Sequence, residues 1–263
     1  MIILGTNSIK DTGYDVDNSV RFNYGDSAYM HKTPSSSGSA TTATMSAWVK
    51  RSTTGVAHVI FGGQTGTDGN NRIKFSISST DQLFCQVFNG GSYDEWRTTQ
   101  LLRDVSAWYH IIFVWDTSNS TAGDRLKFYI NGVRVTSYAT QNEIPLNADL
   151  NMLSTSDTIY VGARKTSSTV NQFFDGYMSE VVLLDGTAVS DATSFGEFDS
   201  DSGIWKPIDV SGLTFGTNGF YLDFEDSANL GNDANGGTDL TEVNLAATDQ
   251  STDTCTNNFA TLN

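Results

Sequence analysis

The sequence predicts an all-β protein, built as a two-sheet sandwich or a barrel, for three reasons. Short runs of alternating or continuously apolar residues recur along the chain, as strands require. Turn-forming Gly, Asn, Asp and Ser separate these runs at intervals of roughly eight to twelve residues. No amphipathic helix is evident, and only a single helical turn is expected, at residues 190–198. With three prolines in 263 residues, the loops depend on the other turn-forming residues.

The most informative stretch begins at Trp108. Residues 108–115 (WYHIIFVW) are apolar at nearly every position, which predicts a strand buried on both faces. Residues 125–130 (RLKFYI) alternate, which predicts a strand with its Leu and Phe face buried and its Arg, Lys and Tyr face in water. Asn131-Gly132 supplies the two positive-φ residues of a type I′ turn. We therefore expect a central strand followed by a tight hairpin.

The other expected strands are shorter. In chain order they are residues 19–24, 45–50, 56–61, 72–78, 82–88, 93–98, 159–161, 173–184 and 220–224. Residues 72–78 and 82–88 are expected to pair as a hairpin. The Gly62-Gly63 pair is expected to end its strand, so that residues 62–71 form a loop on the rim. A long polar connection is expected at residues 137–157.

Composition divides the chain into three parts. Residues 1–18 are polar and predict an N-terminal arm, and residues 19–200 carry most of the expected strands and predict the main domain. In residues 201–263, the strand at 220–224 returns to the sheet of the first strand and a polar tail follows, or else the residues after about 200 form a small separate module. Because residues 1–18 and 225–263 are poor in core-forming side chains, we expect both arms to become ordered on assembly.

The charge of the chain argues against a nucleic-acid partner. Lys and Arg number 15 and Asp and Glu number 30, so the formal net charge is −15. Phosphate binding needs cationic side chains, which are scarce here. A soluble, self-repelling surface explains the excess of carboxylates, and a bound cation is the alternative explanation.

The cysteines and the N-terminus give no sign of a secretory route. Cys85 lies in an apolar run and is expected to be a small core residue, and Cys255 lies in the polar tail, so no disulfide is predicted. No signal-peptide pattern and no run long enough to span a membrane occur, so we expect no membrane insertion. The composition, rich in Ser, Thr, Asn and Gly, is nevertheless of extracellular type. Release inside a virus particle would reconcile this composition with the absence of a signal-peptide pattern.

Four stretches resemble laminin-G-like domains of the concanavalin A-like lectin/glucanase type. They are residues 19–30 (SVRFNYGDSAYM), 43–51 (ATMSAWVKR), 108–132 and 172–188 (QFFDGYMSEVVLLDGTA). The third matches the family's W-hydrophobic-D…YING core, whereas Tyr177-Met178-Ser179 departs from the usual start of the closing strand. The resemblance implies an all-β, two-sheet antiparallel jelly-roll sandwich over residues 19–200. The phrases LDFEDSANLGNDANG and TNNFATLN resemble tailed-phage and marine viral structural proteins.

No catalytic residues are predicted. Hydrolases with this jelly roll carry an E-x-D-x-(x)-E run on a strand, because glycoside hydrolysis needs two carboxylates that face one cleft. The nearest string, residues 197–202 (EFDSDS), lacks the final Glu and is expected in a loop. The three histidines are isolated, and His110 within the apolar run is expected to be a core imidazole. We therefore predict that the protein is not an enzyme.

Two candidate sites remain, each with a simpler alternative. Asp226 and Asp233 lie in a stretch rich in Asp and Asn and are the candidate calcium ligands, although a solvated acidic loop is the favoured explanation. Tyr93 and Trp96, which follow a Gly pair, are the candidate glycan-binding residues because exposed rings stack on sugars. Packing of Trp96 in the core is the alternative.

These observations predict a non-enzymatic virion structural protein of a tailed phage, either an exterior capsid decoration or a component of a tail fibre or spike. Its expected partners are other virion proteins, further copies of itself in a homo-oligomer, with a trimer first, and host or environmental glycans. No nucleic acid is expected to bind. The alternative is a calcium-dependent carbohydrate-binding (lectin) module or a polysaccharide-processing domain.

Overall fold

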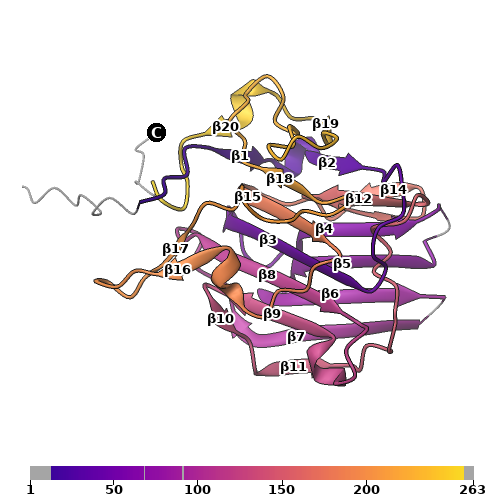
Figure 1. Ribbon diagram of the computed structural model, residues 1–263. Coiled ribbons are helices and arrows are strands. Elements are labelled where there is room, and N and C mark those ends of the chain that lie inside the picture. Colours follow the sequence, from indigo (N-terminus) through magenta and orange to yellow (C-terminus); the bar gives the residue numbers. More distant parts are fainter. Residues whose placement is uncertain (1–12, 68, 91, 258–263) are drawn as a thin grey trace, which may run out of the picture.

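Two antiparallel sheets of eight strands each form a jelly-roll sandwich in the computed structural model, which describes residues 13–67, 69–90 and 92–257 (Figure 1). The all-β, two-sheet prediction is therefore confirmed. Residues 1–12 of the predicted N-terminal arm lie outside the described residues. The predicted helical turn is present as the short 3-10 helix η3 (Ala192–Ser194).

Sheet A contains the central strand that the apolar run predicts. Its order is β10 (Val133–Arg134), β9 (Leu126–Ile130), β8 (Tyr109–Asp116), β3 (Thr42–Arg51), β15 (Gly176–Asp185), β1 (Ser19–Phe22) and β20 (Gln250–Ser251), with β18 (Phe220–Leu222) also paired to β15. The six inner residues of β8 are buried, as a strand covered on both faces requires. Asn131 and Gly132 have φ angles of 47° and 79°, so the predicted turn between β9 and β10 is confirmed.

Sheet B contains the predicted hairpin of residues 72–78 and 82–88. Its order is β11 (Tyr138–Gln141), β7 (Ser92–Leu101), β6 (Gln82–Asn89), β5 (Asn71–Ile77), β4 (His58–Thr65), β12 (Asp157–Val161), β2 (Tyr29–Lys32) and β19 (Thr241–Val243). Two small hairpins lie outside the sheets: β13 (Arg164–Thr166) with β14 (Thr169–Asn171), and β16 (Gly196–Phe198) with β17 (Trp205–Pro207).

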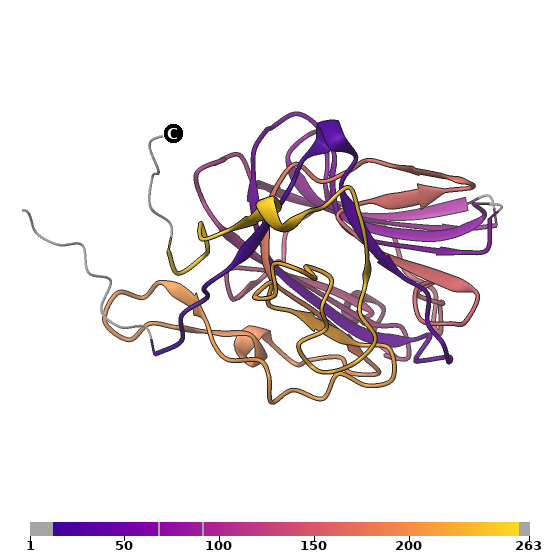
Figure 2. The same cartoon turned by 90° about the horizontal axis from the view of Figure 1, so that it is seen from above.

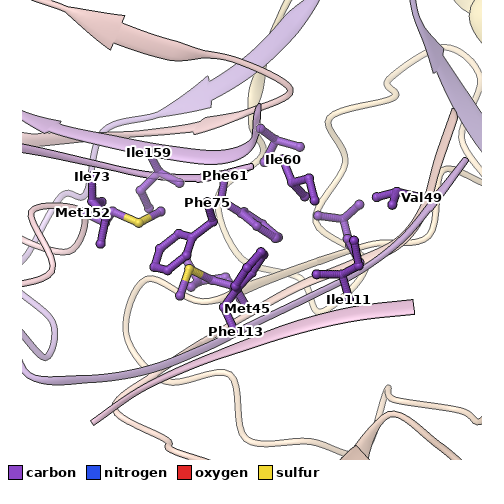
Figure 3. Close-up of a cluster of buried hydrophobic side chains, with 14 of the residues drawn as sticks. Met45, Val49, Ile60, Phe61, Ile73, Phe75, Ile111, Phe113, Met152 and Ile159 are labelled. Carbon is purple, nitrogen blue, oxygen red and sulfur yellow. The ribbon is translucent and has the colours of Figure 1, made fainter. Parts of the chain in front are cut away.

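The core lies between the two sheets and is built from their inward-facing residues (Figure 3). Phe75 of sheet B and Phe113 of sheet A bring their ring centroids to 4.7 Å, and both rings are fully buried. Cys85 is also buried here as a free thiol, which confirms its assignment to the core. Burial of apolar surface on this scale is the main force that holds the sheets together.

A second apolar layer covers the outer face of sheet A, and here the sequence prediction is wrong. The face of β9 that was expected to be wet is closed by the segment after β15: Tyr129 is buried and its hydroxyl donates to the carbonyl of Ser190. His110 lies in this layer, stacked on Trp48 and bonded through Nδ1 to the indole N–H of Trp205. Its assignment as a core imidazole is confirmed, because it is buried and its pKa is lowered to about 3 by desolvation.

Two expected loops are more structured than the sequence predicts. Strand β4 continues through Gly62-Gly63 to Thr65, so only part of the predicted rim loop of residues 62–71 is a loop. Gly63 packs on the core side: an added Cβ would lie 2.1 Å from Met152 Cγ. The connection at 137–157 contributes β11 and the buried side chains Ile144, Leu150, Met152 and Leu153.

The C-terminal segment packs against the sandwich rather than forming the expected arm over its described residues, 225–257. Strand β19 pairs with β2 of sheet B and β20 pairs with β1 of sheet A, so this segment joins the neighbouring edges of both sheets. In Figures 1 and 2 it is the yellow part, which lies beside the indigo N-terminal strands. Leu230 and Leu240, which belong to this segment, are buried in the core. Two leucines in a polar stretch are too weak a signal for this packing to be predicted.

Candidate functional site

The outer face of sheet B carries aromatic, amide and cationic side chains at alternate strand positions. Cross-strand register places Tyr93, Phe88 and Arg72 in one row and Glu95, Gln86 and Lys74 in the next. We call these six residues the β5–β7 surface. Their neighbours in sequence, such as Ile73 and Val87, point into the core, so the alternation of the strands separates the two sets.

The β13–β14 hairpin lies against this face and adds a further cation. It can approach β4 closely because Gly62 has no side chain: an added Cβ would lie 2.5 Å from the carbonyl oxygen of Ala163. The amide of Gln64 holds the hairpin by donating to the carbonyl of Ser167 at 2.8 Å. Arg164, at the start of the hairpin, lines a narrow hollow with Arg72, Ile73, Lys74, Gln86 and Phe88.

The cations of this face stack on phenylalanine rings. The guanidinium carbon of Arg72 lies 3.9 Å from the ring centroid of Phe88. The ring of Phe84 receives Lys74 Nζ at 5.0 Å and the guanidinium carbon of Arg97 at 4.6 Å. Such contacts attract the cations to the rings but supply no negative charge.

Burial and two neighbouring cations both act on Lys74. Lys74 is only 8% exposed, and burial together with the nearby Arg164 and Arg97 lowers the pKa of its ammonium to about 8. The carboxylate of Glu95 lies on the same face but is paired with Arg97 at 2.8 Å. A net positive surface therefore exists in a chain whose formal charge is −15.

The structure separates the two predicted glycan-binding residues. Tyr93 is 58% exposed and belongs to the β5–β7 surface. Trp96 is 1% exposed, packs in the core and donates its indole N–H to the carbonyl of Asn142, so its prediction as a stacking residue is wrong. The error follows from strand alternation, which turns residues 93 and 96 to opposite faces. Arg72 and Lys74 were missed, although their alternation in the predicted hairpin marks them as one face.

The sequence matches the family model described as the concanavalin A-like lectin/glucanases superfamily over residues 24–193. This span is more than half of the chain. The protein belongs to the concanavalin A-like superfamily. No curated protein matches the sequence.

Solved structures of several other proteins are similar in fold. A putative carbohydrate binding protein from Bacteroides ovatus superposes with a TM-score of 0.52 at 18% identity, covering 87% of this chain and 58% of that one. A heptameric SAP-like pentraxin from Limulus polyphemus gives 0.49 at 17% identity, covering 67% and 80%. Domains LG4-5 of the mouse laminin alpha1 chain give 0.47 at 10% identity, covering 68% and 47%. Identities this low show the fold alone.

The predicted calcium ligands of this concanavalin A-like chain do not form a site that fits the ion. Asp226 is exposed and accepts the amide of Ala228 in a turn, whereas Asp233 is buried and accepts the amides of Tyr221 and Asn235 through one oxygen. Within the described residues its other oxygen has no hydrogen-bond partner, and it packs against Gly237. Among the described residues, no group of three or more His, Cys, Asp or Glu side chains could hold a metal. We derive no function through calcium.

The acidic string at residues 197–202 has a structural role. Glu197 and Asp199 both pair with Lys206, at 3.2 Å and 3.5 Å, across the β16–β17 hairpin. Part of this string is therefore strand β16, not loop as expected. These ion pairs explain the string without catalysis.

One buried acid of the concanavalin A-like fold was not singled out by the sequence. Glu180 lies at an irregularity of β15 with φ of 50°, a strained value for a residue that is not glycine. It is 5% exposed and accepts hydrogen bonds from the hydroxyls of Tyr221 at 2.8 Å and Tyr14 at 3.1 Å. Burial raises the pKa of this carboxyl to about 7. Both tyrosine hydroxyls bind the same carboxylate oxygen, Oε2, so Glu180 ties the N-terminal segment to β18.

A cleft of about 420 Å3 lies on the opposite side of this concanavalin A-like domain, beside the β16–β17 hairpin. The edges of Trp48, Trp108 and Trp205 form part of its wall, and each of these indoles is buried. Phe198 and Ile204, 53% and 66% exposed, flank it. Within the described residues, no helix is long and apolar enough to cross a membrane.

Proposed function

We propose that this protein is a carbohydrate-binding domain without catalytic activity and that it binds saccharide on the β5–β7 surface. The observation that carries the proposal is the exposed ring of Tyr93 beside Phe88, set among amide and charged groups on a rigid sheet. Sugars present apolar C–H faces and polar hydroxyls, so a site needs a ring and converging hydrogen-bonding groups.

The strands of sheet B hold these groups in place without ligand. Gln86 and Lys74 are cross-strand neighbours, and Tyr93 and Phe88 are another such pair, so their spacing is fixed by backbone hydrogen bonds. A surface of this kind loses little conformational entropy on binding, which favours affinity. Superfamily membership supports a lectin-like role but does not by itself assign a function.

The same surface gives no support to hydrolysis. A glycosidase needs two carboxylates that flank the scissile bond. Among the described outward-facing residues of β4 to β7, Glu95 is the only acid, and it is paired with Arg97. The adjacent Asp94 pairs with Val87 and faces the other side of the sheet.

Affinity electrophoresis of the full chain in gels that contain a panel of neutral and acidic polysaccharides tests the proposal. We expect retardation by at least one of them, and a loss of about tenfold in affinity for Tyr93→Ala, since a stacked ring contributes on the order of 1 kcal/mol. Phe198→Ala is the matched control because Phe198 is similarly exposed but lines the cleft beside the β16–β17 hairpin. Retardation that Phe198→Ala abolishes and Tyr93→Ala leaves intact would place the site in that cleft and refute the proposal.

The virion role and the trimer inferred from resemblance remain predictions. A carbohydrate-binding appendage of a phage is compatible with the proposed site, and such appendages are commonly symmetric oligomers. Light scattering on the purified chain tests the oligomer: a mass near three times 28.5 kDa supports the trimer, and a mass near 28.5 kDa contradicts it.

A further inference from the structure

We infer that the saccharide bound by the β5–β7 surface is acidic and that Arg72, Lys74 and Arg164 form the subsite for its acidic group. The inference rests on the proposed function and specifies its ligand class. Its basis is a group of cations whose charge the protein itself leaves uncompensated.

Half of the Lys and Arg residues in the described chain have a carboxylate partner. Those with a carboxylate within 4.0 Å are Lys50, Arg51, Arg97, Arg103, Arg125, Arg134 and Lys206. In the part of the chain that the structure describes, Arg72, Lys74 and Arg164 have none. These three cations line the same hollow, so their positive charges lie together at one place on the surface.

The contacts that these three cations do make are with neutral oxygens. Lys74 Nζ donates to Oε1 of Gln172 at 3.0 Å, and Arg164 Nε donates to Oδ1 of Asn171 at 3.1 Å. Arg72 donates through Nη1 to the carbonyl of Gly69. These bonds orient the side chains but leave the positive charges uncompensated.

One donor of this group has no partner within the described residues. Arg72 Nε is buried and makes no hydrogen bond, although burying a polar group without a partner is costly. Guanidinium groups bind carboxylate and sulfate through paired N–H donors, so an acidic group beside Arg72 and Arg164 would compensate their charge.

The size of the hollow indicates how such a ligand would lie. The hollow lined by Arg72, Lys74 and Arg164 is too narrow to admit a group as large as a water molecule. The sugar ring therefore lies on the surface near Tyr93, and its acidic substituent lies over the cations without entering the hollow. An acidic saccharide meets both requirements, a flat ring and one local charge.

A densely charged polyanion fits this surface less well. Nucleic acid places phosphates along its whole length, and each phosphate beyond the cation group would meet a protein of net charge −15. The attraction of the three cations is local, because ionic screening acts over about 10 Å. A ligand with separated charges between neutral faces avoids this repulsion.

Calorimetry on the full chain at fixed ionic strength tests the inference with defined probes. The probes are a partly methyl-esterified oligogalacturonate with separated charges, a sparsely sulfated galactan oligosaccharide, a neutral galacto-oligosaccharide and a single-stranded oligonucleotide. We expect the chain to bind at least one acidic saccharide tenfold or more tightly than the neutral one. The oligogalacturonate and the sulfated probe distinguish carboxylate from sulfate, and tighter binding of either supports the inference.

Arg164→Gln and Arg72→Gln should each weaken binding of the acidic saccharide by roughly tenfold to a hundredfold, since hydrogen bonds to charged groups are among the strongest. Their affinity for the neutral saccharide should stay unchanged. Lys127→Gln is the control, because it removes one positive charge from sheet A. Thermal melts of all variants check that they fold, and two independent arginine variants keep the test decisive if one does not.

The outcomes separate the inference from the proposed function. If the chain binds no saccharide of any kind, both fail. If it binds neutral and acidic saccharides equally, or if Arg164→Gln and Arg72→Gln behave as Lys127→Gln does, only the acidic subsite fails. Binding of the oligonucleotide as tight as that of the acidic saccharides would identify a general polyanion surface and also overturn the inference.

Discussion

Replacing Glu180 by Gln should make the protein more stable at pH 8 and leave its stability almost unchanged at pH 4. The carboxyl has a pKa of about 7 in the folded protein against an ordinary value of 4.5. Between these two values the folded state holds a proton that the unfolded state has released. Stability therefore falls as pH rises through this window and stays constant above it.

The size of the effect follows from the two pKa values. Their difference corresponds to about 3 kcal/mol of unfolding free energy, because one pKa unit is worth about 1.4 kcal/mol. Gln keeps the shape and the hydrogen bond from Tyr221 but carries no charge, so the Glu180→Gln variant escapes this loss. At pH 8 its melting temperature should exceed that of the wild type by roughly 6 to 12 °C for a chain of this size.

Urea unfolding of wild type and variant at several pH values from 4 to 8 measures the difference directly. Glu143→Gln provides the control, because the Glu143 side chain is 71% exposed and should give no such pH-dependent difference. A stability difference between wild type and Glu180→Gln that is independent of pH, or that favours the wild type at pH 8, would refute the assignment of a buried, raised-pKa carboxyl.

Three further predictions concern packing and the binding surface. Trp96→Ala should cost about 3–5 kcal/mol of unfolding free energy, whereas Tyr93→Ala should cost less than about 0.5, and equal losses in urea unfolding would contradict their opposite orientations. Gly62→Ala should destabilise the protein by about 1–3 kcal/mol in thermal unfolding, because its Cβ would collide with the backbone before β13. Gly212→Ala is the control, since Gly212 has open space around it. An equal effect of both variants would count against a close approach of the β13–β14 hairpin to β4. The ammonium of Lys74 should titrate near pH 8 by NMR, because burial and the neighbouring cations lower its pKa. Saturation with an acidic saccharide should raise this pKa, and no change would argue against contact between Lys74 and the acidic group.

The elements that the sequence predicts well are those whose signal is local. The buried strand β8 follows from its apolar run, and the hairpin of β9 and β10 follows from Asn131-Gly132, whose turn needs only two residues. The exposed face predicted for β9 failed because residues about 60 positions later cover it, as the bond from Tyr129 to Ser190 demonstrates. No pattern within β9 could reveal that cover.

The glycine pair in β4 was misinterpreted for a physical reason. Gly62-Gly63 was taken to end the strand, since adjacent glycines usually mark a turn. Here both glycines lie within the strand because each face is covered by other backbone, with Ala163 on one side and Asn151 on the other. A glycine in a strand can mark the close approach of another backbone segment as well as a turn.

The candidate site was predictable in part. The alternation of Arg72 and Lys74 with apolar residues places them on one strand face from sequence alone. Arg164 joins them only through the fold, because the β13–β14 hairpin must cross Gly62 to reach them. Tyr93 was correctly placed on an exposed surface, and Trp96 was not, since a rim tryptophan and a core tryptophan look alike in a short strand.

The pairing of the first strands with the last ones has a consequence for the order in which the protein folds. Strand β1 finds one partner in β20, and β2 finds one in β19, each more than 200 residues later in the chain. During synthesis, at roughly 5–20 residues per second, those edges wait for more than ten seconds without these partners. The central strands of the sandwich can pair early, but β1 gains its partner β20 only after residue 251 has been synthesised. Until then the backbone edge of β1 is unpaired, and it is here that a partly made chain is exposed to association with other chains.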